Sequence, residues 1–85
     1  MKVQIPSALR SYTESAQAEA DGATLDAVLA DLDRQYPGIR FRMIDEQGKI
    51  RRHIRIFVNG VAANTLSLAM QPDDEVILVQ ALSGG

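Results

Sequence analysis

Cysteine is absent from the 85-residue chain, and histidine occurs only once, as His53. Without cysteine there is no disulfide framework, no thiolate site for zinc or an iron–sulfur cluster, and no thiol nucleophile. A single histidine also argues against a His-rich metal site and against most histidine-based catalytic triads. We therefore predict no metal site, and few residues remain that could carry out catalysis within the chain.

Long apolar segments are missing as well. No apolar run approaches the roughly 20 residues of a membrane span, and residues 1–6 lack the hydrophobic stretch of a signal peptide. We expect a cytoplasmic protein without a membrane partner. The hydrophobic content of 46% and the net charge of −2 are typical of a globular chain, and the length fits one small domain.

The first third of the chain shows two short strand patterns. Residues 2–5 alternate polar and apolar, which places Val3 and Ile5 on the core side of a strand. Pro6 has no N–H to donate and marks an irregularity or an edge-facing position there. A second, weaker strand is expected over residues 17–20, followed by a turn at Asp21-Gly22.

A helix of about thirteen residues is predicted from Thr24 to the residues before Pro37-Gly38. Thr24 has the side chain of an N-cap, and Asp26 in the first turn complements the positive end of the helix dipole. Apolar residues recur at three- and four-residue spacing and form one core-facing stripe. This stripe consists of Leu25, Val28, Leu29, Leu32 and Tyr36.

The second half predicts a short helical turn at residues 39–44, a loop at 45–48 and a strand at 50–58. Asn59-Gly60 favours a hairpin turn, because both residues tolerate positive φ, and residues 61–62 would start the return strand. We expect Leu66 and Leu68 to pack beneath a loop. Residues 71–74 form a turn into a last strand at 75–80, so the acidic run there is interpreted as a turn and not as a cation site.

This order of elements predicts an α+β fold of the β-grasp (ubiquitin-like) type. The opening strands would form a hairpin, one main helix would cross one face, and the last strand would lie beside the first. The mixed sheet would contain four to five strands. We expect residues 1–80 to form this domain and residues 81–85 a flexible C-terminal tail.

The last strand predicts a partner surface, because residues 76–79 are apolar on both of its faces. If Val76 and Leu78 point inward, then Ile77 and Val79 face outward together with Phe57. Contiguous exposed apolar surface often marks a binding site. The alternative is a central strand buried on both faces, or a dimer contact.

Charge is also unevenly distributed. Residues 39–60 contain six basic and two acidic residues, a net charge of +4, whereas each flanking segment carries −3. A solvated strand face and a surface that steers a partner protein are both open interpretations. Nucleic acid is not an expected partner, because the basic band lacks interleaved aromatics and any nucleic-acid motif.

The chain ends in Ala81-Leu82-Ser83-Gly84-Gly85. Without Cβ atoms, a Gly-Gly terminus can pass through a channel that is too narrow for side chains. A terminal carboxylate has a pKa of about 3.3–3.7 and is ionised at neutral pH. Such a group can attack the α-phosphate of ATP when a partner enzyme supplies Mg²⁺ and phosphate contacts.

A diglycine at the end of a β-grasp pattern resembles the ubiquitin-like sulfur carriers of the ThiS/MoaD family, and among these the cysteine-forming sulfur carriers most. The resemblance covers essentially the whole chain. It rests on Ile5-Pro6 with Leu9-Arg10, Gly22-Ala23-Thr24-Leu25, Asp31-Leu32, Tyr36-Pro37-Gly38-Ile39, Gly48-Lys49, the strand at 54–59 with Phe57-Val58-Asn59-Gly60, Asp73-Asp74-Glu75-Val76 and Ser83-Gly84-Gly85.

The resemblance implies a carrier that is not itself an enzyme. Its Gly85 carboxylate would be adenylated by an activating enzyme of the ubiquitin-activating type, which uses ATP and Mg²⁺, and no cofactor would be bound permanently. Sulfur from a persulfide or sulfide donor would then give a thiocarboxylate, which a downstream synthase consumes. Gly84 would allow access to Gly85, and the remaining partner contacts would come from Leu82, Ser83, Phe57, Ile77 and Val79.

Several alternatives stay open. The tail has Gln80-Ala81-Leu82 where the molybdopterin branch commonly has prolines, yet molybdopterin, thiazole and thio-siderophore synthesis remain possible destinations of the sulfur. A modifier that joins Gly85 to lysines, and an inert β-grasp interaction domain, are the alternatives of other classes. No residue follows Gly85, so no proteolytic maturation is expected.

Overall fold

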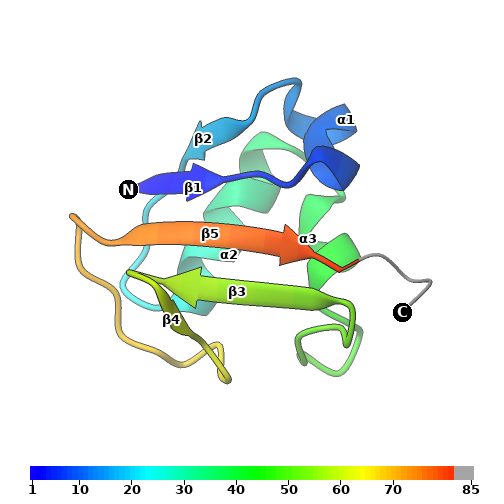
Figure 1. Ribbon diagram of the computed structural model, residues 1–85. Coiled ribbons are helices and arrows are strands. Elements are labelled where there is room, and N and C mark those ends of the chain that lie inside the picture. The colour runs from blue at the N-terminus through cyan, green and yellow to red at the C-terminus, as the bar shows by residue number, and fades with distance from the viewer. Residues whose placement is uncertain (82–85) are drawn as a thin grey trace.

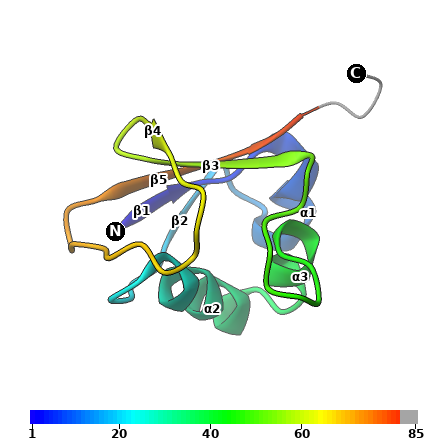
Figure 2. The same cartoon turned by 90° about the horizontal axis from the view of Figure 1, so that it is seen from below.

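The computed structural model describes residues 1–81, in which five strands form one mixed sheet. The strand order is β2-β1-β5-β3-β4, and helices α2 and α3 lie together on one face of the sheet (Figure 1). Figure 2 shows the same two layers from the side. Along the chain the elements are β1 (Lys2–Gln4), a 3₁₀ turn η1 (Ser7–Leu9), α1 (Arg10–Thr13), β2 (Gln17–Glu19), α2 (Leu25–Gln35), α3 (Ile39–Met43), β3 (Ile54–Val58), β4 (Val61–Ala62) and β5 (Glu75–Gln80).

Strand β5 occupies the centre of the sheet and connects the two ends of the sequence. It pairs in parallel with β1, in the register Val3↔Val76. On its other side it pairs antiparallel with β3, in the register Ile56↔Leu78. The antiparallel β1–β2 pair and the β3–β4 hairpin complete the sheet. The predicted β-grasp topology is therefore confirmed.

Helix α2 begins where the N-cap predicted it. The Thr24 hydroxyl accepts a hydrogen bond from the N–H of Ala27 at 3.2 Å, which satisfies one of the free donors of the first turn. The predicted stripe faces the sheet: Leu25, Val28, Leu29 and Leu32 are fully buried, while Tyr36 is half-buried at the edge of the core. The helix has eleven residues instead of about thirteen.

The core lies between this helical layer and the sheet. The inward residues of the central strands are buried as the alternation predicts, and α3 adds its own apolar side. These residues are Val3, Ile5, Ile39, Met43, Ile54, Ile56, Val58, Val76 and Leu78.

Two predictions for the loops were wrong. Residues 50–53 are not part of β3: Ile50 forms an isolated bridge with Ile44, and the Arg51 N–H donates to the Met43 carbonyl. Ile50 therefore pairs with the residue that follows α3 and not with a strand of the sheet. Leu68 is 37% exposed, and the core contact under that loop is made by Met70 together with the half-buried Leu66.

The connection between β1 and β2 contains helical turns that the sequence pattern did not predict. Ser7–Leu9 and Arg10–Thr13 form η1 and α1, and Leu9 is buried in the core. Elements of three and four residues are shorter than the window in which helical periodicity becomes visible. Glu14 ends α1 with a left-handed φ of 56°, which redirects the chain into β2.

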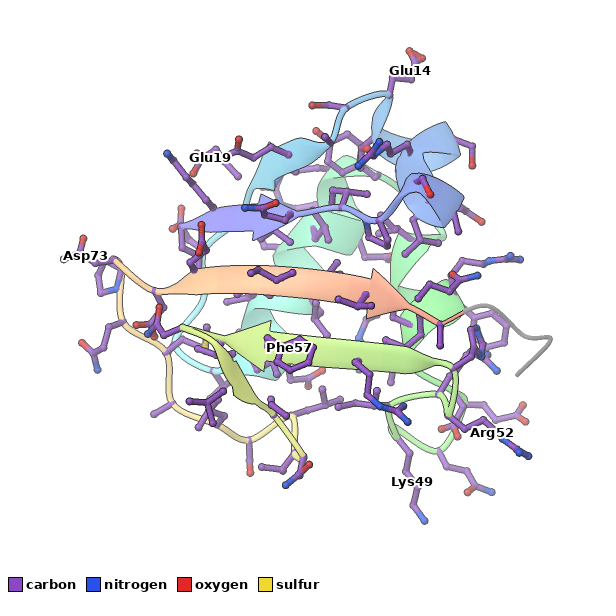
Figure 3. The ribbon with its side chains drawn as sticks, viewed as in Figure 1. Glu14, Glu19, Lys49, Arg52, Phe57 and Asp73 are labelled. Carbon is purple, nitrogen blue, oxygen red and sulfur yellow. The ribbon has the colours of Figure 1, made fainter. Side chains whose placement is uncertain are left out.

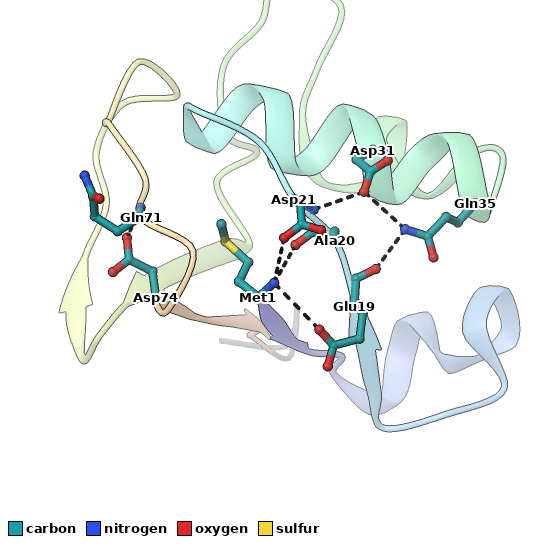
Figure 4. Close-up of polar contacts among 8 residues, drawn as sticks. All are labelled: Met1, Glu19, Ala20, Asp21, Asp31, Gln35, Gln71 and Asp74. Atoms are coloured by element: carbon teal, nitrogen blue, oxygen red, sulfur yellow. Dashed lines mark hydrogen bonds and ion pairs between the residues drawn. The ribbon is translucent and has the colours of Figure 1, made fainter.

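Polar contacts fasten the turns at the end of the sheet where β1 and β5 begin (Figure 4). The Met1 amine donates to the Ala20 carbonyl at 3.0 Å and to Asp21 Oδ1 at 2.9 Å, and the bond to Asp21 raises the pKa of this amine. In the predicted turn before β5, Asp74 Oδ2 accepts from the Gln71 N–H at 2.7 Å, and the bonds that Asp74 accepts lower its pKa. The acidic run is therefore a turn, as predicted.

Asp31 connects helix α2 to the segment after β2. Its carboxylate accepts from Arg34 Nη2 at 2.7 Å, from the Asp21 N–H at 3.0 Å and from Gln35 Nε2 at 3.3 Å. Gln35 in turn donates to the Glu19 carbonyl at 2.8 Å. The hydrogen bond from Arg34, followed by that from Asp21, holds the pKa of Asp31 below its ordinary value.

The depressed pKa of Asp31 predicts a pH-dependent contribution to stability. This contribution is present above the ordinary carboxyl pKa of about 3.9 and is lost as the pH falls through the lower folded-state pKa. In urea unfolding, Asp31→Asn should therefore be less stable than the parent chain at pH 7, and the difference should shrink on acidification below about pH 4. A difference that stays constant across the titration would contradict the role assigned to this carboxylate.

Gly22 predicts a second effect on stability. A Cβ atom at this position would lie 2.5 Å from the Val28 nitrogen and 2.6 Å from the Ala27 carbonyl carbon, both of which are backbone atoms of α2. Because the helix backbone cannot yield easily, Gly22→Ala should lower the free energy of unfolding by about 1–3 kcal/mol. The neighbouring exposed position supplies the control, since Ala23→Ser should stay within about 0.5 kcal/mol. Equal stability of Gly22→Ala and the parent would show that the packing there is looser than described.

Candidate functional site: the open sheet face and the end of β5

The chain leaves the sheet at the end of β5, beside the residue that precedes β3. The Ala81 N–H donates to the His53 carbonyl at 2.8 Å, which extends the β3–β5 ladder by one residue beyond Gln80. The predicted sites Leu82, Ser83, Gly84 and Gly85 lie outside the described residues. Their roles, and the proposed boundary between residues 80 and 81, therefore remain predictions.

The three outward apolar residues predicted from the strand pattern lie together in space. Phe57 and Ile77 are directly opposite each other in the β3–β5 register, and Val79 follows two residues later on β5. Their side chains point away from α2 and α3, and Figure 3 shows the Phe57 ring on this open face of the sheet. Phe57 and Ile77 are half-buried, and Val79 is 37% exposed. We call these three residues the apolar patch.

Polar groups border the apolar patch. Arg55 lies opposite Val79 in the register, and its Nη1 donates to the Arg52 and Ile54 carbonyls at 2.7 and 3.0 Å. On the other side, the outward positions of β1 are the exposed Lys2 and Gln4. An apolar centre with a polar rim is the usual composition of a protein interface. The arrangement is therefore suited to binding another protein.

An exposed aromatic ring that contacts an arginine was not predicted from the sequence. Phe41, on α3, is 59% exposed, and the Arg51 guanidinium lies 4.6 Å from the centre of its ring. Arg51 Nε also donates to the Phe41 carbonyl at 2.8 Å, so both the ring contact and this hydrogen bond fix the position of the Arg51 side chain. The available signal was an aromatic residue between two arginines in Arg40-Phe41-Arg42.

The described residues include neither a metal-ligand cluster nor a membrane-spanning helix. Within residues 1–81, no group of three or more His, Asp or Glu side chains could hold a metal ion. In the same part of the chain, no helix combines the length and the apolar character that crossing a membrane requires. The geometry instead provides a surface for recognition and a chain end that leaves the sheet beside that surface.

The fold and its β5 exit define a ubiquitin-like β-grasp protein, and comparison with known proteins refines this class. Residues 3–85 match the ThiS family, and the chain belongs to that family. Over 89 aligned positions it is 36% identical to the sulfur carrier protein CysO of Mycobacterium tuberculosis, covering 98% of this chain and 96% of that protein. The predicted family is confirmed, and the chain is a homologue of sulfur carrier proteins, a family of carriers and not of catalysts.

Solved structures agree with this assignment. The M. tuberculosis CysO structure superposes with a TM-score of 0.89 at 34% identity, covering 95% of this chain and 98% of that chain. The BexX/CysO complex of Amycolatopsis orientalis contains a chain with a TM-score of 0.90 at 30% identity, covering 99% and 98%. SAMP1 of Haloferax volcanii has a TM-score of 0.81 at 30% identity, covering 100% and 98%.

The apolar patch makes a testable prediction about partner binding. Phe57→Glu should raise the KM for adenylation by an activating enzyme about tenfold, because a carboxylate replaces the largest apolar side chain of the patch. The free energy of unfolding should fall by only about 1 kcal/mol, since the substitution is on the outward face. Steady-state adenylation kinetics and urea unfolding measure the two effects.

Val61→Glu is the matched control for this variant. Val61 lies on the same hairpin, but it is paired with the inward-facing Val58, so its exposed side chain is directed away from the open face. This variant should leave the KM unchanged. Unchanged adenylation by Phe57→Glu, or an equal loss in both variants, would remove the apolar patch from the partner interface.

Proposed function

We propose that this chain is a sulfur carrier whose Gly85 carboxylate is converted to a thiocarboxylate and donates its sulfur in cysteine-type biosynthesis. The observation that carries this proposal is the likeness to sulfur carrier proteins over nearly the full length of both chains. It is supported by the sequence, in which Ser83-Gly84-Gly85 follows the end of β5 after only Ala81 and Leu82. We assign the reaction to the cytoplasm, because it consumes ATP.

The proposed chemistry takes place on partner enzymes in two steps. A carboxylate oxygen of Gly85 attacks the α-phosphorus of ATP, pyrophosphate leaves, and an acyl-adenylate forms; the activating enzyme supplies Mg²⁺ to balance the phosphate charge. Hydrosulfide then attacks the acyl carbon, AMP leaves, and the thiocarboxylate results. A persulfide donor would reach the same product once a thiol reductant cleaves the sulfur–sulfur bond.

Delivery reverses the loading. The thiocarboxylate sulfur displaces a leaving group from an electrophilic carbon of the acceptor and forms a thioester. Water then cleaves the bond between the acyl carbon and the sulfur, which leaves the sulfur on the acceptor as a thiol and restores the Gly85 carboxylate. In this scheme Gly84 permits entry into a narrow active site, because it has no Cβ. Leu82 and Ser83 contact the activating enzyme, and the apolar patch of Phe57, Ile77 and Val79 supplies the folded part of that interface.

Partners of three kinds are implied: an adenylating enzyme of the ubiquitin-activating type, a persulfide or sulfide donor, and a sulfur-accepting synthase. The BexX/CysO complex of A. orientalis supports this proposal, because a protein similar to this chain forms a complex there with another protein. The likeness to M. tuberculosis CysO favours cysteine-type biosynthesis over molybdopterin, thiazole or thio-siderophore synthesis as the destination of the sulfur.

A protein modifier is the second candidate. It is favoured by the likeness to SAMP1 of H. volcanii, which is described as a small archaeal modifier protein. In that reaction a lysine amine, instead of sulfur, would attack the acyl carbon of the same acyl-adenylate, so that AMP leaves and an amide forms. The two candidates share the first step and differ in the product.

Intact-mass spectrometry separates these functions. After incubation with ATP, Mg²⁺, sulfide and the activating enzyme, the chain should gain the mass difference between one sulfur and one oxygen. A chain that lacks Gly84 and Gly85 serves as the control and should remain unchanged. Lysine-linked conjugates without the sulfur product would favour the modifier, and an unmodified parent chain would support an inert interaction domain.

A further inference from the structure

Basic side chains cluster at the end of the molecule where β5 ends. Arg42 comes from α3, and Arg51, Arg52 and His53 come from the segment that precedes β3. A shallow hollow on this surface is lined by Phe41, Arg42, Arg51 and His53. Arg52 projects away from the sheet at the same end (Figure 3). We call Arg42, Arg51 and Arg52, together with the ring of Phe41, the basic end.

The arginines of the basic end form no ion pair within residues 1–81. Asp45 is close enough to interact with Arg51: the hydrogen bond from the Lys49 N–H, and with it the charge of Arg51, lowers the pKa of Asp45. The ion pairs in this part of the chain involve Arg34, Arg40 and the Met1 amine. Arg51 is held by the ring and the carbonyl of Phe41, whereas the guanidinium groups of Arg42 and Arg52 make no hydrogen bond to a described residue. One carboxylate near Arg51 compensates the three positive charges only in part, and an acidic surface on a partner would stabilise the remainder.

The position of the basic end limits what can bind at Gly85. The His53 carbonyl holds the Ala81 N–H, so the last described residue lies directly beside this surface. Four residues, even when fully extended, span at most about 14 Å. A protein that encloses Gly85 therefore binds within about 14 Å of Ala81, on the side of the molecule where the basic end lies. The surface consequently forms part of the approach to the reacting carboxylate.

Acidic residues occupy the opposite end of the sheet. Asp73 and Asp74 precede β5 and Glu75 begins it, while Glu19 and Asp21 lie at the end of β2 and just beyond it. Figure 3 shows Asp73 and Arg52 at opposite ends of the molecule. Although the net charge is −2, an acidic partner surface would attract one end and repel the other. Such a charge distribution orients an encounter before contact is made.

We propose that the basic end docks onto an acidic surface of the enzyme that adenylates Gly85, and that it orients the carrier so that its tail approaches first. This inference rests on the proposed function and adds a second contact region to the apolar patch. The half-exposed ring of Phe41 under Arg51 supplies an aromatic–arginine pair, a combination that is enriched at the energetically dominant positions of interfaces.

The test compares two double variants of equal net charge. Arg42→Gln with Arg52→Gln removes two positive charges from the basic end, whereas Arg34→Gln with Arg40→Gln removes two positive charges that are paired with Asp31 and Asp26. At low ionic strength, kcat/KM for adenylation should fall about tenfold in the first variant and stay within about twofold of the parent in the second. The difference in kcat/KM between the two double variants should decrease in about 0.5 M salt, because salt screens exposed charges. The kcat at saturating carrier concentration should be the same in both.

A binding measurement tests this inference separately from the function on which it rests. Calorimetric titration of the activating enzyme with the chain lacking Gly84 and Gly85 should show the same loss of affinity for Arg42→Gln with Arg52→Gln, although no adenylation can occur. Equal adenylation and equal binding by both double variants would overturn the docking proposal and leave the sulfur carrier intact. A parent chain that is neither bound nor adenylated would overturn both.

Nucleic acid is the competing class of ligand for a basic surface. Fluorescence anisotropy with a labelled single-stranded DNA or RNA of about 20 nucleotides tests it at about 0.15 M salt. We expect no binding by the parent chain. Binding that is lost in Arg42→Gln with Arg52→Gln would assign the surface to nucleic acid and overturn the proposal.

Discussion

The pairing of β5 with β1 on one side and β3 on the other is the constraint on which the rest of the structure depends. Through it, the last strand of the chain becomes the central strand of the sheet, with Val76 and Leu78 buried against the helical layer. Because side chains alternate along a strand, the same pairing places Ile77 and Val79 on the open face beside Phe57. It also directs the chain out of the sheet at one defined end. The positions of the core, of the apolar patch and of the point where the chain leaves the sheet therefore all follow from the pairing of β5 with its two neighbouring strands.

This arrangement separates recognition from chemistry. The described residues form two surfaces, the apolar patch on the sheet and the basic end beside His53, and both lie near the end of β5. A protein of this size needs only a small core and defined contacts if its partners provide ATP, metal and sulfur. The scarcity of cysteine and histidine in the sequence fits such a division of labour.

Much of the fold could be predicted because its signals are local. Thr24 caps α2, Asn59-Gly60 turns the hairpin with two positive φ values, and the apolar run of β5 begins directly after a turn that Asp74 stabilises. The errors occurred where tertiary contacts decide the conformation. Ile50 continues the alternation of β3 in sequence, yet it pairs with Ile44, and the segment with Ser7–Leu9 and Arg10–Thr13 is too short to show a period. In the candidate site, Phe57, Ile77 and Val79 were found from the alternation of two strands, whereas Phe41 is an isolated exposed ring in a five-residue helix that no periodicity reveals.

The central claim is that Gly85 carries the sulfur as a thiocarboxylate. Fragmentation mass spectrometry of the chain isolated from cells that make it tests this claim most directly, because it locates a modification along the sequence. We expect sulfur to replace oxygen only in C-terminal fragments that contain Gly85, while every N-terminal fragment keeps its unmodified mass. An oxygen-to-sulfur mass shift in an N-terminal fragment that lacks Gly85, or a Gly85 that is joined only to lysine side chains, would contradict this claim.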